Sequence, residues 1–274
     1  MISVVKALWL RNLKVFVRNR PALVFSLAFP FFFVFVFSGI FGSASMMLAG
    51  IIIATVFDAS LRISSNTIDD MTGGFMKEVL VSPVSRITVA LGQFASSATV
   101  ATVQGFLIYV IGFFMGLRPD SAMTVVLAVL SMVFVGFIFA GFGLLIASKA
   151  KNMQTFQAVS MAVTMPMTFI SGAYIPLSSL PVPLQWVGRF NPMTYAVHFF
   201  RELIMNVRDD SVVSLLEAEQ KILSFGSFSV TPAFSVLVLA VFGAVFLLLS
   251  TITFTNVDFS KMHRNKAEAA DFWG

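Results

Sequence analysis

The stretch that decides the fold, residues 165–202, reads MPMTFISGAYIPLSSLPVPLQWVGRFNPMTYAVHFFRE. It begins as an apolar helix and then breaks at Gly172, Pro176 and Pro181, before a second break at Asn191-Pro192. Glycine and proline at such positions end or kink helices. A broken, half-apolar segment of this kind between two long apolar runs predicts a structure built at one face of a membrane.

The composition is that of an integral membrane protein. Hydrophobic residues make up 58% of the 274 residues and charged residues only 11%, and the mean hydropathy is +0.91. Soluble globular domains carry about 25% charged residues. The long uncharged runs predict an all-α fold. The net charge of +5 is divided among short segments between these runs, so it indicates membrane topology and not nucleic-acid binding.

Six apolar runs are long enough for helices that cross a hydrocarbon core about 30 Å thick. We place the spans at about residues 21–40, 46–63, 87–116, 121–147, 153–173 and 232–254, all within a membrane domain of residues 21–257. The segments on one side of these spans hold 13 of the 18 Lys and Arg residues. Because Lys and Arg are enriched in cytoplasmic segments, both termini, including the tail 258–274, are predicted to be cytoplasmic in the cell membrane.

Residues 1–20 have the pattern of an amphipathic helix. Val5, Trp9 and Leu13 fall on one side, while Arg11 and Lys14 lie roughly opposite. This pattern predicts an interfacial helix on an anionic lipid leaflet. The alternative is a basic anchor that only sets orientation.

Asp58 and Arg62 are charged residues near one end of the second predicted span. Charges inside a membrane span suggest a functional role. Their spacing of four residues also fits a simple i,i+4 ion pair on one helical face. The sequence leaves both interpretations open.

Residues 66–86, NTIDDMTGGFMKEVLVSPVSR, are the charged, turn-rich segment between the second and third spans. Phe75, Met76 and Val79 share one face, and Ser82-Pro83 ends the pattern. The segment predicts a short amphipathic helix on the cytoplasmic side. It is too short to span the bilayer, so it would lie on lipid or dock into a groove of a partner protein.

Three further predictions concern polar residues in and between the spans. The third span carries Gln93, Gln104 and several Ser and Thr residues, so we expect it to face protein or an aqueous path. Residues 202–221 are predicted to form the main hydrophilic loop, and His198 is predicted to be an interfacial histidine.

Several kinds of chemistry have no signature in the sequence. The dipeptide Gly-Lys does not occur, so the chain has no P-loop for a nucleotide. Neither His198 nor His263 has the spacing of a zinc site, and no G-x-S-x-G motif is present. With no cysteine, disulfides and thiol nucleophiles are excluded. We therefore predict a non-enzymatic protein without a cofactor of its own.

Two stretches resemble a known family. Residues 69–86, with their acidic start, Gly73-Gly74 and the sequence SPVSR, look like the cytoplasmic coupling segment of ABC-2 type exporter permeases. The order FISGAYIP, then LP, then NPMTY and Arg201 resembles the signature of that family before its last span. The resemblance covers nearly the whole chain.

The resemblance implies a transporter that is assembled from several chains. It pairs the permease with a second permease, as a homodimer or with a related chain, and with two copies of a cytoplasmic ATPase that would bind ATP and magnesium. It implies a re-entrant helical pair in residues 174–201, and a transport path lined by spans 1, 2 and 5 of both permeases. The residues that it assigns to ATPase coupling are Asp69, Asp70, Gly73, Gly74, Phe75, Lys77, Glu78 and Pro83. The residues that it assigns to the outer gate are Ser171, Gly172, Pro176, Pro181, Asn191, Pro192, Tyr195 and Arg201.

The composition of the first and fifth spans bears on the cargo. Phe- and Met-rich first and fifth spans suit a hydrophobic or amphiphilic substrate such as a drug, a lipid or a lipid-linked glycan, although such residues also suit contact with lipid. A secondary transporter or channel is an alternative, but it usually shows paired broken helices in both halves. A membrane-embedded lipid-processing enzyme is a third possibility, for which Asp58 and Arg62 are poor catalytic candidates.

Overall fold

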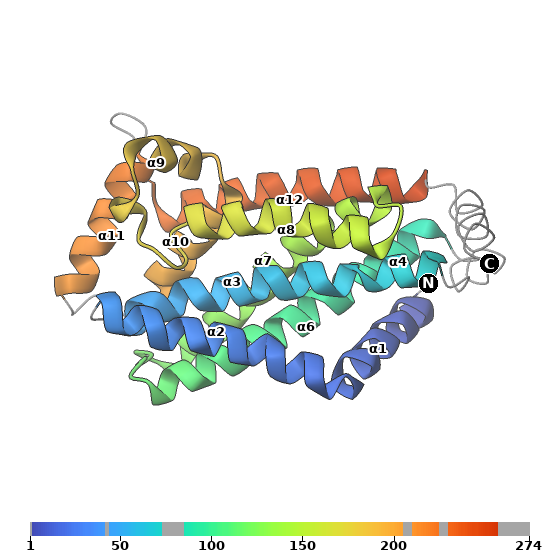
Figure 1. The fold of residues 1–274 in the computed structure, drawn as a ribbon, viewed down its shortest axis with the longest axis horizontal. Coiled ribbons are helices and arrows are strands. Elements are labelled where there is room, and N and C mark those ends of the chain that lie inside the picture. Colours follow the sequence, from blue (N-terminus) through green and yellow to red (C-terminus); the bar gives the residue numbers. More distant parts are fainter. Residues whose placement is uncertain (1, 42–43, 73–84, 205–209, 225–229, 257–274) are drawn as a thin grey trace.

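The computed structural model describes residues 2–41, 44–72, 85–204, 210–224 and 230–256, and every regular element within them is a helix. The body consists of four long helices: α3 (Ala44–Ser64), α6 (Arg86–Phe114), α7 (Ala122–Lys149) and α12 (Pro232–Thr255). Helix α7 packs against the other three, and α3 also packs against α6 (Figure 1). These helices enclose a continuous apolar core.

Polar side chains fix where several of these helices begin. The Ser85 hydroxyl accepts a hydrogen bond from the Thr88 backbone N–H at the start of α6, and Ser121 does the same for Thr124 at the start of α7. Thr231 caps α12, whose first residue is a proline. A side-chain oxygen at this position satisfies an N–H group that has no partner inside the helix.

Helix α3 is the central element of the bundle. Every residue from Met47 to Phe57 is buried, and exposure begins only at Asp58. The close approach at Gly50 explains part of this burial, because a Cβ atom there would lie 2.2 Å from the Ala173 carbonyl oxygen. The chain that follows α8 therefore lies directly on α3.

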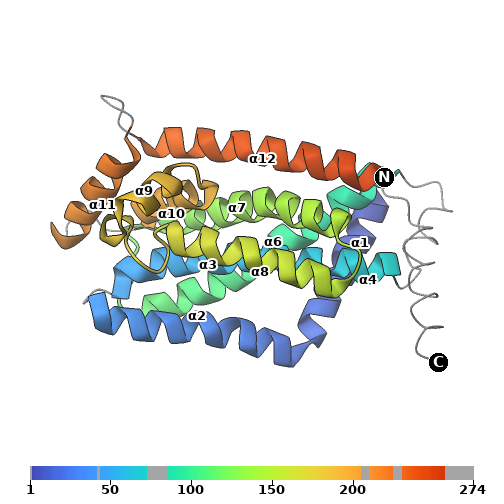
Figure 2. The ribbon, with the colours of Figure 1, turned by 45° about the horizontal axis from the view of Figure 1, so that its top comes forward.

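Two further helices flank α3. Helix α2 (Arg20–Phe41) packs against α3 and α6, and α8 (Met153–Ile170) contacts α3 and α7 (Figure 2). Both expose large apolar side chains, among them Phe25, Phe32 and Met161. Helix α8 continues through Pro166, which lies inside it.

Helices occupy all six predicted span positions, with bounds that differ by a few residues. Within the described residues, the length and apolarity needed to cross a membrane are found in four helical segments, Met47–Met71, Arg86–Phe114, Ala122–Lys149 and Pro232–Thr255. Helix α1 (Ile2–Arg18) and α2, bent by 71° from each other, give a fifth if they form one broken span. The structure thus supports four or five spans, and the sixth stays a prediction.

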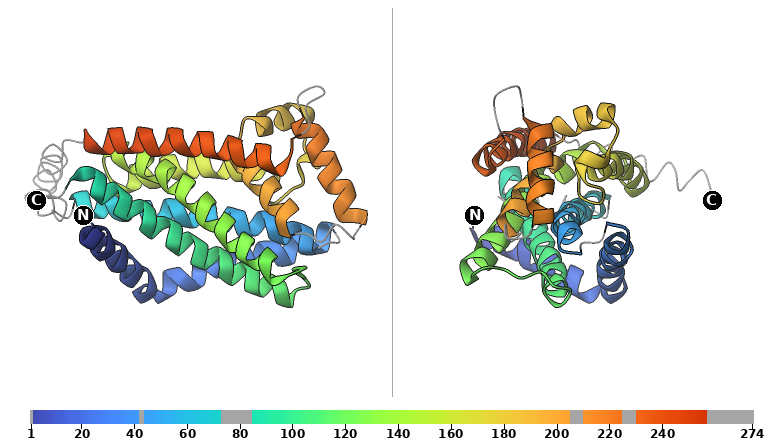
Figure 3. Two further views of the ribbon diagram at one scale, coloured as in Figure 1. Left: turned by 180° about the vertical axis from the view of Figure 1, so that it is seen from behind. Right: turned by 90° about the vertical axis from the view of Figure 1, so that its left-hand side faces the viewer.

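The two ends of the bundle differ. At one end, here called the α4 end, lie α1, α4 (Asn66–Thr72) and the last turn of α12 (Figures 1 and 3). At the other, the α10 end, lie η1 (Leu177–Ser179), α9 (Val182–Arg189), α10 (Pro192–Ile204) and α11 (Asp210–Leu223).

The prediction of a hydrophilic loop over residues 202–221 is wrong. Helix α10 continues to Ile204, and most of the rest forms α11. Glu219 of this helix is buried, with 3% of its surface exposed. This carboxylate pairs with Arg201 inside the protein.

Candidate functional site

A polar network at the α4 end joins three helices. Arg11 of α1 forms an ion pair with Asp70 of α4, with Nη2 and Oδ2 2.5 Å apart. The Gln93 amide of α6 also donates to Asp70 across 3.4 Å. Asn12 donates to Gln93 Oε1 at 2.9 Å and to Ser96 Oγ at 3.2 Å.

This network holds α1 against the protein body. Asn12 and Gln93 are almost fully buried, and the Trp9 indole donates a hydrogen bond to Thr99 at 2.9 Å. Leu8 packs into a core cluster with Phe94 of α6. The predicted amphipathic helix is therefore present, and its buried face rests on α6. Its contact with lipid stays a prediction.

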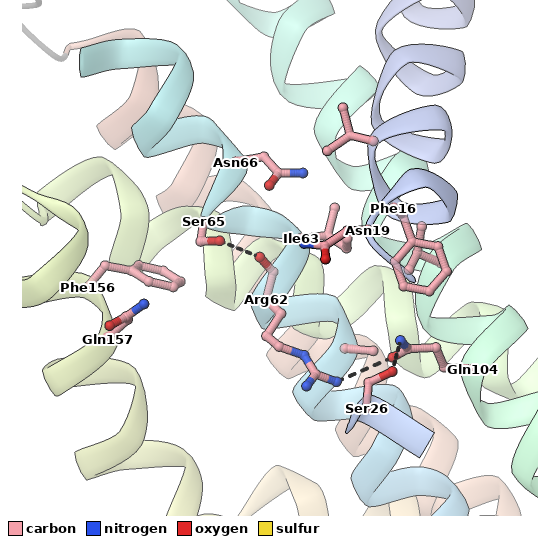
Figure 4. A pocket seen from close by; sticks show the side chains of 13 residues that line it. Phe16, Asn19, Ser26, Arg62, Ile63, Ser65, Asn66, Gln104, Phe156 and Gln157 are labelled. Carbon is pink, nitrogen blue, oxygen red and sulfur yellow. Dashed lines mark hydrogen bonds between the residues drawn. The ribbon is translucent and has the colours of Figure 1, made fainter. Parts of the chain in front are cut away.

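A cavity of about 270 Å³ lies next to this network, and Figure 4 shows its lining. We call it the polar chamber. Arg62 extends from α3 into it, facing Gln104 of α6 and Ser26 of α2, while Asn19 lies near the junction of α1 and α2. Phe156 and Gln157 of α8 face it from the opposite side.

Hydrogen bonds fix the positions of the polar side chains that line this chamber. The Arg62 guanidinium contacts Gln104 Oε1 at 3.4 Å through Nη2. The Gln104 amide nitrogen donates to Ser26 Oγ at 2.8 Å, and Ser26 in turn donates to the Leu23 carbonyl. Gln104 and Ser26 are buried, and their hydrogen bonds hold the Gln104 side-chain oxygen against Arg62.

A second cavity, of about 290 Å³, adjoins the first between α2, α3 and α8. We call it the apolar chamber. The two cavities share Ser26 and Arg62 in their linings. The aromatic side chains in its wall are in contact with one another: Phe29 lies 4.8 Å from Phe33, and Phe33 lies 4.7 Å from Tyr174, measured between ring centroids.

Asp58 and Arg62 form the i,i+4 ion pair that their spacing predicts, with Nη2 and Oδ2 3.1 Å apart. Both side chains are about half exposed. The pair lines the apolar chamber, and Arg62 alone of the two also lines the polar chamber. Burial, with the nearby Asp58 carboxylate adding to it, raises the pKa of Tyr174 to about 12, so this phenol is neutral at physiological pH.

At the α10 end, Arg201 is fully buried. Its guanidinium donates to Glu219 Oε1 at 2.5 Å and to the Gly172 carbonyl at 2.9 Å. Gly172 adopts a positive φ of 86°, which favours glycine at this turn. One side chain thus joins α10, α11 and the turn after α8.

His198 is buried within the protein, and its place at the membrane interface stays a prediction. It is 1% exposed and lies between two carboxylates, with nitrogen-to-oxygen distances of 3.6 Å to Glu202 and 3.8 Å to Glu219. Burial alone raises the pKa of Glu219, but Arg201 and His198 outweigh it and hold that pKa below its ordinary value. Burial raises the pKa of Glu202.

Most residues predicted for the outer gate belong to this same region. Asn191 donates to the Met167 carbonyl at 2.6 Å and accepts from the Met193 N–H, which ties the start of α10 to α8. The Tyr195 hydroxyl donates to the Arg189 carbonyl at 2.8 Å. Ser171 caps α8, Pro176 and Pro181 precede η1 and α9, and Pro192 begins α10.

The predicted coupling residues are only partly described. Asp69 and Asp70 lie on α4, whereas Gly73, Gly74, Phe75, Lys77, Glu78 and Pro83 fall outside the described residues. The sequence interpretation missed Asn12 and the burial of Glu219. A single Asn inside an amphipathic helix was a signal for the first, and an acidic residue at helical spacing from Leu216 and Leu223 was a signal for the second. Among the described residues, no group of three His, Asp or Glu side chains could hold a metal ion.

Comparison with known proteins agrees with this architecture. Residues 3–205 match the family model described as ABC-2 type transporter. The chain is 27% identical over 255 residues to ycf38 of Cyanophora paradoxa, whose name describes it as a transport permease, with 87% of this chain and 85% of the relative covered. It is 26% identical to nodulation protein J of Rhizobium leguminosarum bv. viciae, covering 46% and 48% of the two chains. It is 27% identical to YbhR of Escherichia coli strain K12, whose name describes a multidrug ABC transporter permease, covering 48% and 36%. The chain therefore belongs to the ABC-2 type transporter family and is a multi-pass permease subunit of an ABC transporter.

Proposed function

We propose that this chain is the cell-membrane subunit of an exporter that moves a hydrophobic or amphiphilic compound out of the cell. ATP and magnesium would be bound by a separate ATPase, two copies of which would serve two permease chains. The lack of a P-loop supports this division of labour, because the chain cannot cradle a nucleotide in that way.

The observation that carries the proposal is the ion pair between Arg11 and Asp70. Asp70 belongs to the segment that resembles the coupling region of the family, and it is bonded to both α1 and α6. A force applied to this segment would reach α1 directly. Helix α1 continues through Asn19, which lines the polar chamber, into α2, which lines both chambers.

The α10 end is the proposed outer gate. Helix α10 packs among α3, α7 and α12, so its apolar face is covered by the bundle. Backbone that is broken at membrane depth must be buried in protein or line water. This packing supports a re-entrant role for residues 174–201. The position of this region opposite α1 and α4 supports cytoplasmic termini and an extracellular gate.

A second permease is proposed to cover the exposed faces of α2 and α8. Phe29, Met161 and Met165 are each more than half exposed and line the apolar chamber or its rim. A chamber that opens sideways in this way would be closed by a partner of the same kind or by lipid.

Co-purification tests the proposal. The tagged full chain, extracted gently from membranes of its own host, should retain a chain with a P-loop and hydrolyse ATP. Asp70→Asn, which preserves shape but removes the charge, should keep the complex together while lowering the stimulation of hydrolysis by cargo. Efficient transport by the purified chain alone would overturn the proposal.

A further inference from the structure

We propose that the two chambers form one binding site for an amphiphile with an acidic head group, whose head lies in the polar chamber against Arg62 and whose tail lies in the apolar chamber. This inference rests on the proposed export function and adds the chemical class of the cargo. It is carried by the position of Arg62, which lines both cavities, and by the aromatic wall of the second cavity.

The sizes of the cavities favour a shared ligand. Each measures under 300 Å³, at or below the lower limit of ordinary ligand pockets, whereas the two together fall within the usual range of about 300–1,000 Å³. They meet at Ser26 and Arg62. Along α3 the lining runs from Ala54 to Ile63, which corresponds to about 13 Å at the rise of an α-helix.

The charges give the ligand its direction. Among the described residues that line the polar chamber, Arg62 is the one charged side chain, and its ion-pair partner Asp58 lines only the apolar chamber. In the apolar chamber the same acidic group would also face Asp58. An acidic head is therefore favoured in the polar chamber, and the uncharged tail remains beside Phe29, Phe33 and Met165.

Arg62 is positioned for such a ligand. Within the described residues, its side-chain contacts with Asp58 and Gln104 are both made through Nη2. Both bidentate edges of a guanidinium include Nη2, so Nη1 and Nε are each left to donate a single charge-assisted hydrogen bond to an oxyanion. The buried pair Gln104 and Ser26 holds the guanidinium at the junction of the chambers.

The test measures binding of three probes with one tail to the purified full chain in nanodiscs of uncharged lipid. The probes are 11-(dansylamino)undecanoic acid, its neutral amide and an analogue with a trimethylammonium head, and their fluorescence reports binding. The intact chain should bind the acid most tightly. Arg62→Gln should weaken binding of the acid by about 10- to 100-fold, as for loss of a hydrogen bond to a charged group, and leave the amide nearly unchanged.

The Asp58→Asn variant shows whether Arg62 binds the ligand or only stabilises α3. If the ion pair only stabilises α3, both substitutions should impair binding alike. If Arg62 holds an acidic head, Asp58→Asn should tighten binding of the acid, because it removes the competing carboxylate. Phe29→Ala should weaken the acid and the amide equally, and Lys151→Gln, an exposed cation outside both chambers, should change neither.

The source of the acid is then assigned by competition. Displacement of the probe by phosphatidylglycerol would indicate a lipid head group, and binding that persists would indicate a free single-chain acid; both results require the Arg62 dependence. Equal loss of acid and amide in Arg62→Gln, or unchanged acid binding, would overturn the inference. Since no ATPase is present in this assay, its failure leaves the export proposal standing, and failure of ATPase co-purification leaves this binding result standing.

Discussion

The Arg201 guanidinium lies 2.5 Å from the Glu219 carboxylate in a position fully enclosed by protein, although 18 residues separate the two in sequence. Arg201 also donates to the Gly172 carbonyl. One buried charge pair therefore links α10, α11 and the turn after α8.

Removing one member of this pair should lower the stability of the folded protein. Arg201→Leu leaves Glu219 buried without its cation, and we expect a loss of about 3–5 kcal/mol in the free energy of unfolding. The double variant Arg201→Leu/Glu219→Leu should recover most of that loss, because a buried pair can be replaced by apolar residues at little cost. Thermal unfolding in detergent measures both. A double variant no more stable than Arg201→Leu would contradict this view.

The same pair predicts a dependence on pH. The pKa of Glu219 is lowered in the folded protein, so its contribution to stability is present above the ordinary glutamate value of 4.5 and is lost as the pH falls through the folded value. The unfolding temperature of the intact chain should therefore fall as the pH is lowered below the ordinary glutamate value of 4.5. Glu219→Gln should be less stable at neutral pH and show a shallower drop.

Glu202 provides a control of opposite sign. Burial raises its pKa, so its ionisation costs stability as the pH rises above the ordinary glutamate value. Glu202→Gln should therefore be at least as stable as the intact chain at neutral pH and should keep the acid-induced drop. If Glu202→Gln abolished that drop, the assignment to Glu219 would be wrong.

Gly50 is a second position at which a substitution should lower the stability of the protein. A Cβ atom there would lie 2.2 Å from the Ala173 carbonyl oxygen, a backbone atom that cannot move aside alone. Gly50→Ala should lower stability by about 1–3 kcal/mol and displace the turn after α8. Gly112→Ala is the matched control, because its Cβ would meet only the flexible end of Leu48. Equal effects of the two would show that the close approach is unimportant.

The polar network at the α4 end predicts that loss of the Arg11 charge uncouples ATP hydrolysis from cargo binding. Arg11→Gln removes the partner of Asp70 while leaving Asn12 and Trp9 to hold α1 on α6. We expect the complex with the ATPase to persist and the stimulation of hydrolysis by cargo to fall about fivefold or more, the scale of a typical coupling energy. Lys14→Gln, an exposed cation on the same helix, is the control. Equal loss in both variants would indicate a general effect of charge.

The helices could be predicted well from the sequence because their signals are local. Uncharged runs located α2, α3, α6, α7, α8 and α12, and Pro192 marked the start of α10. The Asp58 and Arg62 pair followed from a spacing of four residues.

What could not be predicted depends on contacts between distant residues. The burial of Glu219 requires Arg201, and that of Asn12 requires Gln93, a residue of a different helix. The chambers are lined by residues of helices that lie far apart in sequence, among them α2, α3 and α8, which no local pattern specifies. Charged residues in residues 202–221 therefore suggested a loop, although one of them belongs to the protein interior.

Transport in inverted membrane vesicles tests the central claim most directly. Vesicles that contain the full chain and its co-purifying ATPase should accumulate the dansylated acid or its neutral amide when ATP and magnesium are supplied, and should do so in the presence of an uncoupler. The account predicts no accumulation with a non-hydrolysable ATP analogue. Accumulation by the chain alone, driven by a proton gradient without ATP, would contradict it.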